Sequence, residues 1–306
     1  MGMIVSASRR TDIPAFYGEW FINRLRAGYC VARNPMNPAQ ETRVSLRPGD
    51  VDAVVFWSKD FRPMLGHLDE IRAAFPVCVQ HTLTPYAAPL EPRLADKRGI
   101  IAGMRELGAR LGPDVVAWRY DPIVFAGDKD VRWHLRAFER ACGLLEGATR
   151  TCVFSFLQMY PRIRRRMSGL GTPPDAAAQL ELAAGMAGIA REHGIRLTAC
   201  CQELALEALG IARGACISPE LIRAATGREP AQKRDAGQRS LCRCLKSVDI
   251  GAYHCCPHMC AYCYANCGGE AVLRGTTRRA ITLTSPRFST AAGCAILVSG
   301  DICQRS

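Results

Sequence analysis

The sequence has no long hydrophobic run. Its longest apolar stretches, such as residues 51–57 and 115–118, are far shorter than the ~20 residues that a membrane-spanning helix needs. The first residues also lack the basic region and the apolar core of a secretory signal. We therefore expect a soluble, cytoplasmic protein with no membrane partner, whose cysteines lie in a reducing compartment and serve metal binding more readily than disulfides.

Acidic residues are also scarce relative to basic ones. The 306 residues include 40 Lys and Arg against 28 Asp and Glu, which gives a formal net charge of +12. The arginines are scattered, and the densest basic run, residues 162–166, is not embedded in a known nucleic-acid motif. A nucleic-acid partner is therefore possible but not favoured, and we expect a polar or anionic small-molecule substrate.

A glycine-rich G-x-G-x-x-G turn is missing after the first predicted strand, which argues against a dinucleotide-binding domain. Short β-branched runs alternate instead with longer helical patterns, and this order is typical of a parallel sheet covered by helices. We predict an α/β fold, a (β/α) barrel that is closed or partly open, with an open doubly wound sheet as the alternative. The predicted strands are residues 4–7, 29–32, 53–57, 77–82, 115–120, 151–156 and 195–199, and the predicted helices are residues 15–26, 61–74, 94–111, 129–145 and 176–193.

Charged side chains follow several of these strands. Because the carboxyl ends of barrel strands open on one face, where active sites form, we expect them to meet in a polar cup. The alternative is that they merely cap the following helices, as Asp12 could do before Pro14. The candidate catalytic residues are Arg10, Asp12, Lys59, Arg119, Asp121 and Glu203.

Cysteine, by contrast, is abundant and concentrated, since seven of the sixteen cysteines lie within residues 242–267. Cys256, Cys260 and Cys263 have the spacing C-x3-C-x2-C, which predicts three thiolate ligands of a [4Fe-4S] cluster whose fourth iron stays open. The alternative is a structural zinc ion held by Cys242 and Cys244 together with Cys260 and Cys263.

Three further residues of this segment are candidates for contact with a cofactor. His258 stands between two predicted ligands, where it could bond to a cluster sulfur or simply face solvent. Tyr262 and Tyr264 could shield the metal or stack on an adenine ring, and they could equally be packing residues.

Two long motifs make the chain resemble a known family. They are Ser-Ala-Ser-Arg-Arg-Thr-Asp-Ile-Pro at residues 6–14 and, at residues 242–266, a series that combines Cys-x-Cys, Asp-Ile-Gly-x-Tyr and Cys-x-His-x-Cys-x-Tyr-Cys-Tyr-Ala-Asn. Together they resemble the bacterial family DUF1848. The resemblance implies a barrel-like domain with a cysteine motif similar to that of radical S-adenosylmethionine enzymes, although those enzymes carry the motif after the first strand.

Such an enzyme would use an electron donor and the cluster to cleave S-adenosylmethionine, and the resulting radical would abstract hydrogen from a small-molecule substrate. By charge, Arg10, Lys59 and Arg119 would bind an anionic group, and the carboxylates would bind an ammonium or hydroxyl group.

Two alternatives to this enzyme stay open. In the first, one of the spare cysteines Cys242, Cys244, Cys255 and Cys267 closes the cluster, which would make the chain an electron-transfer or redox-sensing protein. In the second, a zinc-stapled protein binds nucleic acid. We predict a barrel-like domain over residues 1–240, a cysteine-rich motif at its mouth over 241–270, and a separate tail over 271–306.

Overall fold

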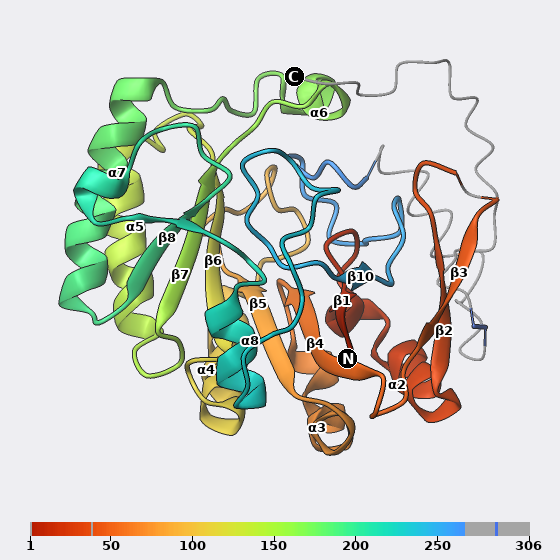
Figure 1. Ribbon diagram of the computed structural model, residues 1–306. Helices are drawn as coiled ribbons and strands as arrows, with labels where there is room; N and C mark the ends of the chain where they lie inside the picture. The colour runs from red at the N-terminus through yellow and green to blue at the C-terminus, as the bar shows by residue number, and fades with distance from the viewer. Residues whose placement is uncertain (1, 38, 267–284, 287–306) are drawn as a thin grey trace.

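The computed structural model describes residues 2–37, 39–266 and 285–286 (Figure 1). Its centre is an eight-stranded sheet in the order β10-β1-β4-β5-β6-β7-β8-β9, in which every neighbouring pair is parallel. The strands are β1 (Met3–Ala7), β4 (Val51–Ser58), β5 (Val77–Thr82), β6 (Val116–Ile123), β7 (Thr151–Phe156), β8 (Arg196–Cys200), β9 (Ala212–Gly214) and β10 (Val248–Asp249).

Helices connect most of the consecutive strands, and several begin at a capping side chain. Asp130 accepts a hydrogen bond from the backbone N–H of Trp133, and Asp175 accepts one from Ala178, so each carboxylate satisfies an otherwise unpaired amide of the first turn. The helices are α1 (Ile13–Phe16), α2 (Gly18–Ala27), η1 (Arg62–His67), α3 (Leu68–Ala74), α4 (Lys97–Leu111), α5 (Val131–Leu144), α6 (Pro161–Met167), α7 (Ala176–Glu192), η2 (Glu207–Leu209) and α8 (Pro219–Thr226).

The sheet is covered on both faces. Because successive side chains of a strand point to opposite faces, Val54 and Val79 join the large core beneath helices such as α4 and α5, whereas Val55 and Cys78 belong to a second core. Leu221 of α8 packs in that second core, and Figure 1 shows α8 lying across β4 and β5. The segment that follows α8 therefore lies on a different face from α4 and α5.

These findings confirm the predicted α/β fold with a parallel sheet. All seven predicted strands and all five predicted helical regions are present, and six of the strands belong to this sheet. Most ends are shifted by one to three residues, and two helical regions are divided. Within the described residues β9 and β10 do not pair with each other, so the sheet is not closed into a complete barrel there.

The predicted strand at residues 29–32 is real but does not belong to the main sheet. It is β2 (Tyr29–Arg33), which pairs antiparallel with β3 (Glu41–Ser45) in a separate two-stranded hairpin. A strand signal alone does not say which partner the strand takes. The polar residues after β2 therefore do not join those at the end of the main sheet.

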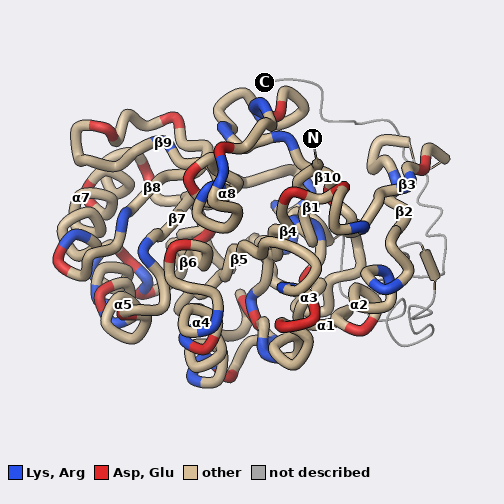
Figure 2. Tube along the Cα trace, turned by 60° about the horizontal axis from the view of Figure 1, so that its bottom comes forward, with Lys and Arg blue, Asp and Glu red and all other residues tan. Residues whose placement is uncertain are grey.

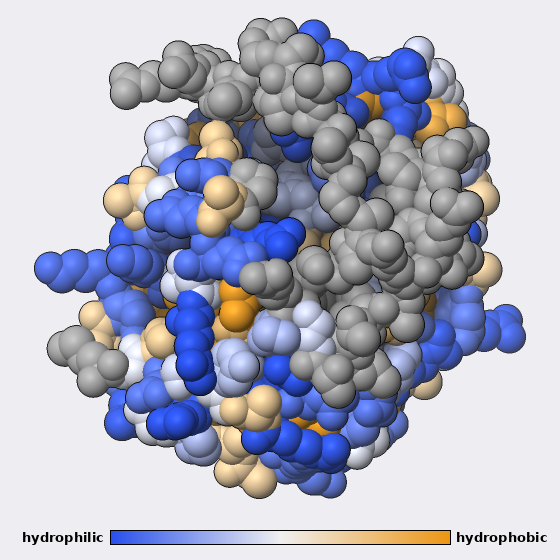
Figure 3. Space-filling model, turned by 90° about the vertical axis from the view of Figure 1, so that its right-hand side faces the viewer, coloured by the Kyte–Doolittle hydropathy of each residue, from blue (hydrophilic) through white to orange (hydrophobic). Residues whose placement is uncertain are grey.

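The described surface carries both signs of charge. Figure 2 shows Lys and Arg interspersed with Asp and Glu along the helices, and Figure 3 shows one side on which hydrophilic residues predominate among the described atoms. None of the helices within the described residues combines the length and apolar character that a membrane crossing requires. Most of the predicted tail, residues 271–306, lies outside the described residues.

Candidate functional site

A cavity of about 530 Å³ lies at the carboxyl ends of the central strands. Its walls come from the loop after β1, from the ends of β4, β6, β7 and β8, and from the cysteine-rich segment. The structure brings most of the predicted charged residues together there, whereas Glu203 is exposed and is not among the lining residues. The lining candidates are Arg10, Asp12, Lys59, Arg119 and Asp121.

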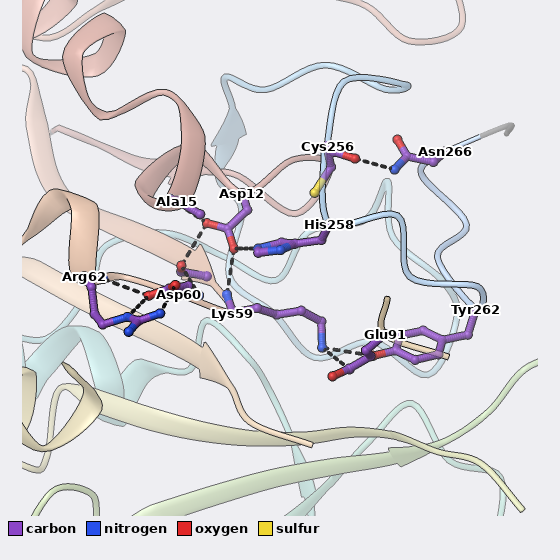
Figure 4. A network of polar contacts seen from close by, with 11 residues as sticks. Asp12, Ala15, Lys59, Asp60, Arg62, Glu91, Cys256, His258, Tyr262 and Asn266 are labelled. Carbon is purple, nitrogen blue, oxygen red and sulfur yellow. Dashed lines mark hydrogen bonds and ion pairs between the residues drawn. The ribbon is translucent and has the colours of Figure 1, made fainter. Parts of the chain in front are cut away.

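Asp12 is the centre of a buried polar network at this cavity (Figure 4). Its Oδ1 accepts from the Ala15 backbone N–H at 3.0 Å and from the Ser58 hydroxyl at 2.8 Å. Its Oδ2 lies 2.7 Å from the Lys59 backbone nitrogen and 2.8 Å from His258 Nε2. Asp12 therefore caps α1, which was the alternative prediction for this residue. It also holds His258 of the cysteine-rich segment in place.

Glu91 forms a second buried network that the sequence did not reveal. Its carboxylate accepts from Lys59 Nζ at 2.8 Å, from the Thr84 hydroxyl at 2.5 Å, and from the Tyr262 hydroxyl and Lys97 Nζ. Burial acts to raise the pKa of Glu91, but Lys59 and Lys97 outweigh it and lower the pKa to about 2. Glu91 is thus a buried carboxylate that two lysines keep ionised.

Arg119 and Asp121 lie side by side near the end of β6. The Arg119 guanidinium pairs with the Asp121 carboxylate, which also accepts from the Ser155 hydroxyl. The other guanidinium nitrogen, Nη1, lies 2.8 Å from Cys216 Sγ and 3.4 Å from Gln80 Oε1. This arginine therefore connects the polar cup to a cysteine that the sequence analysis had not considered.

Asp249 ties the cysteine-rich segment to the first strand. Its carboxylate accepts from Ser6 Oγ at 2.9 Å, from Ser8 Oγ at 2.7 Å and from the Arg9 backbone N–H at 2.8 Å. The pairing of β10 with β1 continues this contact, and Ile250 donates its backbone N–H to the Ser6 carbonyl. The two motifs by which the chain resembles a family are therefore neighbours in space.

Two adjacent arginines line the cavity beside this junction. Arg10 donates to the Gly251 carbonyl at 3.3 Å and lies over the Tyr253 ring, 5.3 Å from its centroid. Arg9 lies over Trp57 at 4.9 Å, and no partner for its buried Nη2 occurs among the described residues. One guanidinium nitrogen in the wall therefore remains available to a bound molecule.

The predicted ligands Cys256, Cys260 and Cys263 are brought together on the wall of the cavity, and Cys256 and Cys260 are buried. Burial raises the pKa of Cys256, and the neighbouring Asp12 and the other two thiols raise it further. The negative charge of each thiolate disfavours ionisation of the other two thiols. All three therefore become thiolates together only when a cation balances their charge. This donor set therefore suits a thiophilic metal centre.

Within the described residues, no group of three or more His, Cys, Asp or Glu side chains is arranged so that it could hold a metal ion as the side chains stand. A cube of four irons differs from a single ion because each ligand binds a different corner. The side chains of the three thiols would therefore have to rotate before they could hold either a cube or a single ion.

Two buried polar atoms beside the thiols have no partner among the described residues. They are Nδ1 of His258, whose other ring nitrogen meets Asp12, and Oδ1 of Asn266, whose amide nitrogen donates to the Cys256 carbonyl at 2.9 Å. Both residues line the cavity. Buried polar groups are nearly always paired in folded proteins, and these two atoms are placed to pair with a molecule bound in the cavity.

The two candidate tyrosines differ in their surroundings. Tyr262 is buried and its hydroxyl meets Glu91 and Lys59, whereas Tyr264 is 42% exposed and lies near Tyr253, at 6.5 Å between ring centroids. Both line the cavity. The remaining candidate ligands, Cys242 and Cys244, line the cavity together with cysteines from earlier in the chain.

Comparison with known proteins gives a family. No curated protein matches the chain. Residues 4–265 match the family model of DUF1848, described as a domain of unknown function. The matched region includes the loop after β1, all of the parallel sheet except Met3, and all three predicted ligands. The chain belongs to the DUF1848 family.

Proposed function

We propose that this protein is an iron–sulfur enzyme similar to the radical S-adenosylmethionine enzymes, with Cys256, Cys260 and Cys263 as cluster ligands. One observation carries the proposal: the three thiols of the C-x3-C-x2-C motif line the same cavity as Lys59 and Asp121. A structural metal site would not need a cavity of about 530 Å³ with charged walls.

The chemistry that a bound [4Fe-4S] cluster supplies is an electron for cleaving S-adenosylmethionine, which yields a radical able to take hydrogen from a substrate. The protein's own residues hold and orient these partners. His258 is fixed by Asp12, which leaves its Nδ1 directed away from that contact, and Asn266 leaves a carbonyl oxygen free to accept. This side-chain oxygen of Asn266 would accept a hydrogen bond from an amino group of the bound molecule.

The substrate side of the cavity favours an anionic group. The guanidinium carbons of Arg9 and Arg119 lie 4.9 Å and 5.2 Å from the Trp57 ring centroid, so two positive charges flank one aromatic side chain. Asp121 neutralises Arg119, but Nη2 of Arg9 has no partner among the described residues. An anion bound beside Arg9 would accept a charge-assisted hydrogen bond, which is stronger than a hydrogen bond between neutral groups.

The lysine in the cavity has a different role. Burial acts to lower the pKa of Lys59, but Glu91 and Cys260 outweigh it and raise the pKa. Lys59 therefore stays protonated, and its hydrogen bonds to Glu91 and Tyr262 hold that ring in place. We assign Lys59 to positioning the cysteine-rich segment and to balancing the thiolate charge beside it.

The test is anaerobic reconstitution with iron and sulfide, followed by electron paramagnetic resonance of the reduced protein with and without S-adenosylmethionine. We expect a component of the spectrum that shifts when S-adenosylmethionine is added and that disappears in Cys256→Ala, Cys260→Ala and Cys263→Ala. Cys30→Ala is the matched control, because Cys30 is fully buried and lies in the core instead of the cavity.

Other outcomes would select the alternatives. A cluster spectrum that S-adenosylmethionine leaves unchanged would favour electron transfer or redox sensing. A colourless protein that binds only zinc, and whose affinity for nucleic acid falls steeply with salt, would overturn the radical chemistry.

A further inference from the structure

A second group of cysteines lines the same cavity. It consists of Cys200, Cys201, Cys216, Cys242 and Cys244, and each is at most 7% exposed. These residues come from the ends of β8 and β9 and from the turn before β10, so no single short motif contains all five. We call them the second cysteine group and call Cys256, Cys260 and Cys263 the first.

The five thiols form a closed ring of neighbours. The sulfurs of Cys200 and Cys216 lie 3.4 Å apart. Cys201 is close enough to Cys200 and Cys242 to affect their pKa values, and Cys244 is close enough to affect those of Cys242 and Cys216. Cys30 differs, since it lies in the large core beneath the helices and not in the cavity wall.

The backbone is shaped to gather these thiols. Successive side chains of a strand point to opposite faces, so Cys200 and Cys201 would normally diverge. Cys201 instead has a φ of 49°, a left-handed conformation that costs free energy for a residue with a Cβ. This turn at the end of β8 brings both neighbouring thiols into one group.

Backbone hydrogen bonds hold the later part of the ring against the earlier part. The Leu245 N–H donates to the Ile217 carbonyl at 2.9 Å, which places the turn that carries Cys242 and Cys244 beside Cys216. These residues are distant in sequence, so the grouping is a product of the fold and not of local chain geometry.

Positive charge surrounds the second cysteine group. Arg119 Nη1 lies 2.8 Å from Cys216 Sγ, and Arg119 is only 7% exposed. Arg9 is close enough to Cys244 and Cys216 to interact electrostatically, and Arg239 is close enough to Cys201. Cationic neighbours stabilise thiolates, which are the form of cysteine that binds metals.

We propose that the second cysteine group binds a second metal centre, a zinc ion or an iron–sulfur cluster, in the wall of the cavity. Zinc–sulfur bonds of about 2.3 Å in a tetrahedron place ligand sulfurs about 3.8 Å apart, close to the 3.4 Å between Cys200 and Cys216, whereas a disulfide bond is about 2.05 Å long. Rotation of the side chains about their Cα–Cβ bonds would direct four thiolates to the metal, each thiol giving its proton to solvent.

The test is designed so that the first cysteine group cannot contribute. In the variant Cys256→Ala/Cys260→Ala/Cys263→Ala, purified and reconstituted without oxygen, we expect metal equivalent to one centre per chain to remain after gel filtration. Iron accompanied by acid-labile sulfide would identify a cluster, and zinc without sulfide would identify a single ion. X-ray absorption at the retained metal should show sulfur as its nearest neighbours.

Adding Cys242→Ser and Cys244→Ser to that variant should abolish the retained metal, whereas adding Cys30→Ala should not. A first-group variant that is folded by circular dichroism but retains no metal would overturn the proposal, as would a Cys200–Cys216 disulfide in the protein isolated under reducing conditions. Because the first group is absent throughout, the result does not depend on whether S-adenosylmethionine binds.

Discussion

Asp12 and His258 are 246 positions apart in the chain, and Oδ2 of the one lies 2.8 Å from Nε2 of the other inside the protein. Both side chains are 5% exposed. The contact joins the N-cap of α1 to the loop that carries the first cysteine group, so a residue of the first strand's loop determines how the predicted ligands are presented.

Replacing Asp12 by asparagine should destabilise the protein although the two side chains have nearly the same shape. In Asp12→Asn the new amide cannot accept from all four donors, and we expect the free energy of unfolding to fall by roughly 1.5–3 kcal/mol, the range for hydrogen bonds to charged groups. Urea unfolding measures this difference. Asp130→Asn is the control, because the exposed Asp130 only caps α5 and Asn is nearly as good an N-cap. Equal stability of the two variants would contradict the prediction.

Glu91 should make the protein sensitive to acid. Its pKa in the folded protein is about 2, below the ordinary value of 4.5, so its contribution is fully present above pH 4.5 and is lost as the pH falls towards 2. Protonation of Glu91 should lower the free energy of unfolding by on the order of 3 kcal/mol.

Unfolding experiments between pH 2.5 and pH 7 test this, with Glu91→Gln for comparison. We expect the variant to be less stable at neutral pH and to show a flatter acid limb, since it has no carboxylate at this position to protonate. Parallel pH profiles of the two proteins would contradict the role of Glu91.

His258 should influence how firmly iron is held. If the first cysteine group binds a cluster as proposed, His258→Ala removes the contact that orients the ligand loop, and the rate of iron loss to a chelator should rise roughly tenfold or more, as for other residues that orient ligands. His67→Ala is the control, because His67 pairs with Glu19 away from the cavity. Unchanged iron loss in His258→Ala would count against this role.

Gly251 should not tolerate a side chain. A Cβ added there would lie 2.1 Å from Ser8 Oγ, and that hydroxyl is already bound to Asp249. We expect Gly251→Ala to lower the free energy of unfolding by roughly 1–3 kcal/mol, the cost of overpacking. Gly66→Ala, where no neighbour lies within 4 Å of the added Cβ, should change stability little in the same urea titration.

The sequence predicted the elements of this fold better than their partners. Alternating apolar runs and helical periodicity are local signals, and they located six strands of the parallel sheet within a few residues. They could not place β2, because pairing with β3 depends on a neighbour whose own sequence, Glu-Thr-Arg-Val-Ser, has a weak strand pattern.

The candidate site was also predictable only in part, because local spacing is visible in the sequence whereas contacts between distant residues are not. Polar residues at strand ends and the C-x3-C-x2-C motif are readable from spacing, and the structure places them around one cavity. Glu91 was missed because it lies in an irregular stretch between β5 and α4. Cys242 and Cys244 were predicted as ligands, but their neighbours Cys200, Cys201 and Cys216 were missed because these residues meet them only through the return of the chain after α8.

The pairing of β1 with β10 has a consequence for how the protein is made. Ser6 and Asp249, which join these strands, are 243 positions apart, and at about 5–20 residues per second a ribosome needs on the order of 10–50 s to synthesise the chain between them. During that interval the loop that carries Asp12 has no His258 to meet, so the cavity cannot be complete. The metal that we propose could therefore enter the completed site only after the segment that carries His258 has been synthesised.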